Sequence, residues 1–186
     1  MPGRCRMALL GLAATLNGCA GTPDPRLAPF AATLAANDSA TTALEQWCAV
    51  RHIADPARVI ASVLNSAPAT APADARYLLD LPGAEQLGYR HVRLACGSTV
   101  LSEAHNWYVP ARLTAEMNRT LDTSSVPFGK VAAPLGFRRE RLGTLPRGHR
   151  DCPRGTILAH RALLRLPDGR PLALLVECYT RANLAP

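Results

Sequence analysis

Residues 89–110 read YRHVRLACGSTVLSEAHNWYVP, and their pattern is typical of a β-hairpin. In its first arm, a spacing of two places four side chains on one face of a strand: Arg90, Val92, Leu94 and Cys96. Val92, Leu94 and Cys96 are residue types that prefer an interior, so Arg90, on the same face, is expected to point inward too. A buried guanidinium keeps its charge and needs an anion beside it. That anion belongs either to the chain or to a ligand.

The rest of the chain repeats this pattern of short elements between turns. Sixteen prolines and thirteen glycines among 186 residues favour turns over a helical bundle. Asp168-Gly169 predicts a second hairpin, between strands at 157–166 and 171–180. The last strand, PLALLVECYT, is apolar on both faces, so we expect it to lie centrally in a sheet and to be covered on both sides.

The remaining elements are shorter and complete an α+β domain. We expect about six antiparallel strands with short helices packed over them. The further elements are predicted as a helix at 40–51, a strand at 58–64, a helical turn at 74–79, a helix at 113–121, a helical or turn segment at 127–134 and a strand at 136–145. The turn of the first hairpin is expected at Gly97-Ser98.

The first 18 residues have the features of a signal peptide. Arg4 and Arg6 precede an apolar stretch at 7–16, which is too short to span a membrane as a mature helix. Leu16-Asn17-Gly18-Cys19 resembles the lipobox of bacterial lipoproteins, in which the cysteine carries lipid. An ordinary secretory signal cut nearby is the alternative. We therefore predict a signal peptide at 1–18, a lipid-anchored tether at 19–36 and one domain at 37–186.

Export changes what the cysteines are expected to do. Four remain in the predicted domain, an even number in an oxidising compartment: Cys48, Cys96, Cys152 and Cys178. Four cysteines allow three pairings, and the sequence does not choose among them. Because the chain has no cysteine or histidine cluster with metal-ligand spacing, we expect disulfides and no metal. The predicted location is the periplasmic side of the envelope, on the outer membrane.

Composition excludes some classes of function. Apolar residues make up 48% of the chain and charged residues 19%, which is ordinary for a globular protein. The formal charge is +7, but no basic run with interleaved aromatic residues is present, so nucleic acid is not an expected partner. We expect a monomer that contacts the membrane through its N-terminal lipid.

Two charged residues lie within apolar strand patterns, Arg90 and Glu177. They could form a buried ion pair with each other or lie exposed at an edge. Alternatively, they could lie at opposite ends of a cavity, where Arg90 receives a ligand carboxylate and Glu177 meets a hydroxyl or ring proton. Among the histidines, His105 and His160 are possible pocket residues. Trp107 is expected to line the pocket or the core.

Three segments resemble the chorismate lyase family. YRHVRLACGSTVL is similar to its central strand, VPFGKVA to its segment with a proline, a hydrophobic residue and a glycine, and HRALLRLPDGRPLALLVECYT to its closing hairpin. The segments occur in the family's order across residues 89–184. The resemblance implies a six-stranded antiparallel sheet with helices over one face. It also implies elimination of pyruvate from chorismate to give 4-hydroxybenzoate, without any cofactor.

The same resemblance assigns residue roles. Arg90 matches an arginine that binds a carboxylate, and Glu177 matches a glutamate at the para-oxygen end of the ligand, so both are candidate catalytic residues. Phe128, Gly129 and Trp107 are further candidate ligand-binding residues. The HNWYVP segment at 105–110 departs from the family pattern, and export separates the protein from cytoplasmic chorismate. The fold also serves as an effector-binding domain in one class of transcription regulators. A non-catalytic lipoprotein that binds a small aromatic carboxylate is therefore the alternative.

Overall fold

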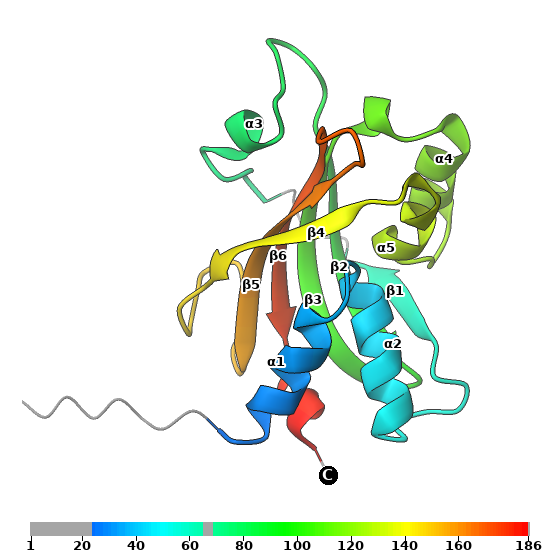
Figure 1. Cartoon of the computed structure of the whole chain (residues 1–186), viewed down its shortest axis with the longest axis vertical. Coiled ribbons are helices and arrows are strands. Elements are labelled where there is room, and N and C mark those ends of the chain that lie inside the picture. Colours follow the sequence, from blue (N-terminus) through cyan, green and yellow to red (C-terminus); the bar gives the residue numbers. More distant parts are fainter. Residues whose placement is uncertain (1–23, 65–68, 186) are drawn as a thin grey trace, which may run out of the picture.

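A single antiparallel sheet forms the centre of the molecule (Figure 1). The computed structural model describes residues 24–64 and 69–185. The strands are β1 (Val59–Val63), β2 (Gly88–Cys96), β3 (Thr99–Tyr108), β4 (Arg138–Thr144), β5 (Leu158–Arg165) and β6 (Pro171–Tyr179). Their order in the sheet is β1-β2-β3-β6-β5-β4. The predicted α+β class with six antiparallel strands is confirmed.

Short helices cover the two faces of the sheet unequally. They are α1 (Leu27–Ala35), α2 (Ala40–Val50), α3 (Ala75–Leu78), α4 (Ala115–Thr123) and α5 (Phe128–Val131), with 3-10 turns η1 (Pro110–Arg112), η2 (Ala133–Leu135) and η3 (Arg181–Leu184). The first two and last two α-helices pack on one face, where they form two apolar clusters with the sheet. α3 and the loops beside it cover the other face. We call the first the helical face.

Both predicted hairpins are present. β2 pairs with β3 along its whole length, with Cys96 opposite Thr99 at the turn. β6 lies between β3 and β5, and all nine of its residues are buried. Its two-sided apolar pattern therefore predicted its central place correctly.

The predicted tether is wrong for residues 27–35, which form α1. Phe30 and Leu34 are fully buried, and the Phe30 ring lies 5.2 Å from that of Trp47 and 5.3 Å from that of Tyr179. Burial of this apolar stripe stabilises the helix, because a helix of nine residues is only marginally stable on its own. The predicted signal peptide, Cys19 and the start of the tether lie outside the described residues.

Two disulfides resolve the open pairing of the four cysteines. Cys48 of α2 bonds to Cys96 of β2, and Cys152 bonds to Cys178 of β6. The first ties α2 to the helical face, and the second ties the β4–β5 loop to the opposite face. Within the described part of the chain, no helix is long and apolar enough to cross a membrane.

Candidate functional site

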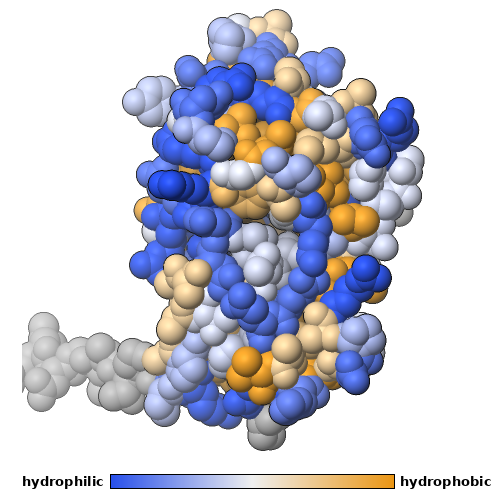
Figure 2. Space-filling view, turned by 45° about the vertical axis from the view of Figure 1, so that its right-hand side comes forward, coloured by the Kyte–Doolittle hydropathy of each residue, from blue (hydrophilic) through white to orange (hydrophobic). Residues whose placement is uncertain are grey.

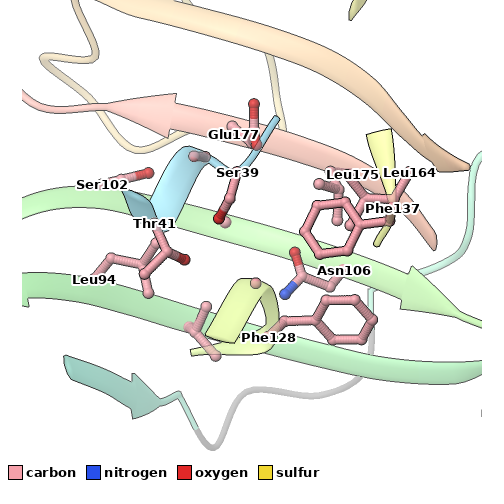
Figure 3. Close-up of a pocket in the computed structure, with 14 residues that line it drawn as sticks. Ser39, Thr41, Leu94, Ser102, Asn106, Phe128, Phe137, Leu164, Leu175 and Glu177 are labelled. Carbon is pink, nitrogen blue, oxygen red and sulfur yellow. The ribbon is translucent and has the colours of Figure 1, made fainter. Parts of the chain in front are cut away.

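A cavity of about 40 Å³ lies on the helical face, between the sheet, the N-terminus of α2 and α5. Figure 3 shows side chains from all three directions around it. Its polar lining comes from Ser39, Thr41, Ser102, Asn106 and Glu177. Figure 2, which brings α2, α4 and α5 forward, shows a hollow of weakly polar residues bordered by hydrophilic side chains.

Three of the sequence-predicted site residues line this cavity, and two do not. Glu177, Phe128 and Gly129 are at its walls. Trp107 is buried on the opposite face, where its indole Nε1 donates to the carbonyl of Ala69. Its neighbour Asn106 faces the cavity instead, because successive side chains of a strand alternate. Trp107 therefore belongs to the core, one of the two places expected for it, and does not line the cavity as a ligand-binding residue.

Arg90 lies on the helical face beside the cavity and is not part of its lining. Asn106, directly opposite it in β3, does line the cavity, as does Val92 two positions along β2. Arg90 is 5% exposed, and its Nη1 and Nη2 have no hydrogen-bond partner among the residues that the structure describes. Burial lowers the pKa of Arg90, although Tyr108 and Asp122 offset part of this effect.

Glu177 pairs with Arg139 of β4, not with Arg90. The Arg139 Nε donates to one carboxylate oxygen at 3.3 Å, and Nη2 donates to the other. The ion pair is therefore bidentate. The Tyr179 hydroxyl also donates to this carboxylate, at 3.0 Å. Both charged side chains are 4% exposed. The buried-ion-pair interpretation thus named the right glutamate and the wrong arginine.

This ion pair sets the charge of its surroundings. Burial alone would lower the pKa of Arg139, but the charge of Glu177 and its hydrogen bond outweigh burial and raise it. Burial also raises the pKa of Tyr179. Arg139 Nη2 lies 3.3 Å from Nδ1 of His160 on β5, which is 2% exposed. Since the guanidinium can only donate, this His160 nitrogen accepts.

His160 gives a pH-dependence that can be measured. Burial lowers its pKa to about 4, and the charges of Arg139 and Arg141 add to this effect against that of Glu177. Because the unfolded chain takes up this proton near pH 6.5, stability should fall as the pH falls from about 6.5 to 4. We expect His160 to contribute a loss of about 3 kcal/mol over that range.

Denaturant unfolding at pH 7 and pH 4 checks this prediction. In His160→Asn, the amide oxygen can accept from Arg139 without titrating. The wild type should therefore lose more stability than this variant between the two pH values. Equal losses would show that His160 does not control the acid sensitivity.

Several polar groups around the cavity have no hydrogen-bond partner within the described part of the chain. Thr41, Ser102 and Asn106 are at most 5% exposed, and their side chains form no hydrogen bond to any described residue. Figure 3 shows Asn106 between the rings of Phe128 and Phe137. Buried polar groups normally bond to protein or water. These side chains are therefore available to a polar ligand.

Gly129 allows α5 to approach α2 closely. A Cβ at this position would lie 2.5 Å from Ser39 Oγ and 3.0 Å from Thr41 Oγ1. Ser39 Oγ also accepts from the Thr42 backbone N–H at 3.4 Å as the N-cap of α2. Lys130 pairs with Glu45 at 2.6 Å, which holds α5 against α2. The glycine thus positions one wall of the cavity.

The other predicted pocket histidine lies on the opposite face. His105 is 7% exposed, and its ring lies 4.0 Å from that of His91 in a stacked arrangement. Its Nδ1 and the Tyr89 hydroxyl are 2.7 Å apart, and its Nε2 and the carbonyl of Asp151 are 2.9 Å apart. Burial and the neighbouring His91 lower its pKa. His160 alone of the two borders the Arg139–Glu177 pair. No group of three or more metal-binding side chains occurs within 24–64 or 69–185.

Sequence reasoning missed Arg139 and the cavity contributions of Ser39 and Thr41. Arg139 belongs to a run of charged residues, Arg138 to Arg141, that is typical of an exposed edge strand. Alternation within that run places Arg139 on the helical face, and this was the available signal. For Ser39 and Thr41, the only signal in the sequence was their position at the start of a predicted helix.

Comparison with known proteins assigns the chain to a family. No family model matches it. The uncharacterized protein y4mC of Sinorhizobium fredii (strain NBRC 101917 / NGR234) is 39% identical over 185 residues, a match that covers 86% of this chain and 78% of y4mC. The chain belongs to the y4mC family.

Solved structures show the fold. The effector domain of PhnF from Mycobacterium smegmatis matches with a TM-score of 0.55 and 11% identity, over 77% of this chain and 89% of that domain. A structure of PhnF itself matches with a TM-score of 0.55 and 11% identity, over 79% of this chain and 65% of PhnF. The fold is therefore the chorismate lyase-like fold found in the effector-binding domains of GntR-family regulators.

Some matched proteins are considerably longer. The possible transcriptional regulator YydK from Bacillus subtilis subsp. subtilis str. 168 matches with a TM-score of 0.44 and 14% identity, over 67% of this chain and 59% of YydK. The chain thus spans less than two thirds of the length of PhnF and of YydK.

Proposed function

We propose that this chain is an exported binding module that takes a small aromatic carboxylate in the cavity of the helical face. Its fold is that of small-ligand effector-binding domains, which supports a binding role. One observation carries the proposal further. Arg90 is a buried cation whose two terminal nitrogens have no hydrogen-bond partner among the described residues, and a ligand carboxylate would supply that partner.

The nearest candidate anions of the chain do not fill this role. The carboxylate of Glu177 is occupied by Arg139 and Tyr179. Asp122 on α4 raises the pKa of Arg90 by its charge but lies in an exposed position and forms no ion pair with it. A carboxylate that enters beside Asn106 would meet an amide on one side and the Arg90 guanidinium on the other. Bidentate contact between an arginine and a carboxylate is among the stronger polar interactions in proteins.

The ligand's far end would lie toward Glu177. There the cavity offers the hydroxyls of Ser39, Thr41 and Ser102 around a carboxylate whose charge Arg139 balances. A phenolic hydroxyl can donate to the carboxylate and accept from one of these hydroxyls. A second acid group, once ionised, has no proton to donate to the Glu177 carboxylate. This arrangement favours a hydroxylated aromatic acid such as 4-hydroxybenzoate.

Binding requires the cavity to widen. Its volume of about 40 Å³ is small beside the roughly 150 Å³ of an engineered cavity that takes benzene. Phe128 and Phe137 border the space, and α5, which carries Phe128, is only four residues long. Outward movement of these two rings would make room for the ligand and would open the path from Asn106 to Arg90.

Binding is better supported by the geometry than elimination. The resemblance to chorismate lyase places Glu177 at the para-oxygen of the ligand, but here the carboxylate already accepts three hydrogen bonds from Arg139 and Tyr179. Elimination of pyruvate from chorismate would then depend on holding the substrate in a reactive geometry and excluding water. A binding module needs neither a reactive geometry nor the exclusion of water.

Calorimetric titration of the full chain with 4-hydroxybenzoate tests the proposal. The neutral 4-hydroxybenzyl alcohol serves as a control ligand, and Arg119→Met, which removes an exposed arginine of α4, serves as a control variant. Loss of a charge-assisted hydrogen bond should weaken binding of the acid by about 10- to 100-fold in Arg90→Met. Equal affinity of wild type and Arg90→Met, or no binding of the acid, would overturn it.

Incubation with chorismate separates binding from catalysis. A binding module should release 4-hydroxybenzoate and pyruvate no faster than the spontaneous reaction. Release above that rate, lost in Arg90→Met and kept in Arg119→Met, would instead assign the lyase activity that the sequence resemblance implies.

We further propose export and a lipid anchor at Cys19. The two disulfides support an oxidising location, where such bonds persist. Lipid labelling of cells that express the full chain should mark the wild type and not Cys19→Ser. Labelling that persists in Cys19→Ser would contradict the lipobox assignment.

A further inference from the structure

The β4–β5 loop concentrates exposed arginines. Arg147, Arg150 and Arg154 are all exposed, and they lie within eight residues of this loop. Between Arg141 and Asp168, the sequence contains one acidic residue, Asp151. We call Arg147, Arg150 and Arg154 the arginine surface.

This loop is fixed to the body of the molecule. The Cys152–Cys178 disulfide joins it to β6, where Cys178 is fully buried. The carbonyl oxygen of Asp151 lies 2.9 Å from His105 Nε2 on β3. The Asp151 carboxylate approaches Arg150 and the His149 ring, which leaves Arg147 and Arg154 without an acidic partner among the described residues. The backbone that carries these charges is therefore already fixed, so binding through them would cost little further conformational entropy of the loop.

The loop that carries the arginine surface lies on the same side of the molecule as the start of α1. Ile157 and Leu158, just after the loop, pack against the apolar cluster that also contains Phe30 and receives Leu27 of α1. In Figure 1, the β4–β5 loop and the start of α1 both lie on the left. The proposed lipid anchor at Cys19 is eight positions before Leu27, the first residue of α1, so the membrane that holds it would lie close to this side of the molecule.

We propose that the arginine surface docks the domain on the phosphate groups of an anionic membrane. The guanidinium fork binds phosphate oxygens in pairs, and each such residue near an anionic surface adds to membrane affinity. Residues 146–156 contain no Phe, Tyr or Trp, so the stacking that single-stranded nucleic acid requires is lacking there. This inference rests on the proposed export to the envelope. It assigns the loop an orienting role that is independent of the ligand cavity.

Vesicle co-sedimentation of the full chain tests the proposal. Vesicles of phosphatidylcholine alone report binding through the N-terminal segment, and vesicles with one quarter phosphatidylglycerol add the anionic surface. Arg147→Gln/Arg154→Gln is compared with Arg58→Gln/Arg119→Gln, which removes the same charge from two exposed arginines elsewhere. Phosphatidylglycerol should increase the affinity of the wild type for vesicles. We expect this increase to be about 30-fold smaller in the first variant and unchanged in the second. Arg147→Lys/Arg154→Lys should retain most of that gain, and 0.5 M salt should remove it from every protein.

Three outcomes would overturn the docking surface. Wild type could bind both kinds of vesicle equally, or both glutamine variants could lose the same amount, which would indicate net charge alone. Preferential binding of an acidic peptide or RNA over the anionic vesicles would assign another class of partner. Absence of binding to phosphatidylcholine reports on the N-terminal anchor, and ligand titration reports on the cavity. Each failure is therefore distinguishable from the others.

Discussion

Replacement of Arg90 by methionine is expected to raise the free energy of unfolding of the ligand-free protein by about 3 kcal/mol. The reason is that a buried charge without a partner costs several kcal/mol of desolvation, whereas methionine fills a similar volume without that cost. Arg90 is 5% exposed, and burial already lowers its pKa. Most substitutions destabilise a protein, so a gain of this size would be diagnostic.

Urea unfolding at pH 7 measures this effect. Arg119→Met, which removes an exposed charge from α4, should change stability by no more than about 0.5 kcal/mol. The same Arg90→Met protein should lose its stabilisation by 4-hydroxybenzoate, because a ligand stabilises only the form that binds it. A less stable Arg90→Met protein would show that Arg90 supports the fold and would remove the basis of the ligand proposal.

Arg90 illustrates what strand alternation makes predictable. A spacing of two among apolar residues predicted that its side chain is buried, and this did not require knowing which elements pack against β2. The structure confirms the burial. A run of residues that is apolar on both faces placed β6 in the centre of the sheet. Such predictions depend only on residues near each other in sequence, which is why they succeeded.

The partner of Glu177 could not be found in this way. Arg139 and Glu177 are 38 residues apart and belong to β4 and β6, which are separated by β5. Their contact depends on strand order and on a long side chain that crosses its neighbour, and neither can be inferred from local pattern. The disulfide pairings also depend on strand order, so sequence left all three open. For Trp107 the sequence left the pocket and the core open, and the structure places it in the core, on the face opposite Asn106.

Replacement of Glu177 by methionine is expected to lower the free energy of unfolding by about 4 kcal/mol. This change leaves the Arg139 guanidinium buried without its anion and removes the acceptor of the Tyr179 hydroxyl. Arg139→Met should cost a similar amount, because it leaves the Glu177 carboxylate uncompensated. Removal of either partner from a buried pair exposes the full desolvation cost of the other.

The double variant Arg139→Met/Glu177→Met separates pairing from packing. With both charges gone, the apolar neighbours Leu164 and Leu175 can pack against the new side chains, and most of the loss should be recovered. The coupling energy from the four proteins should therefore exceed about 2 kcal/mol in urea unfolding. Additive losses would mean that Arg139 and Glu177 act independently.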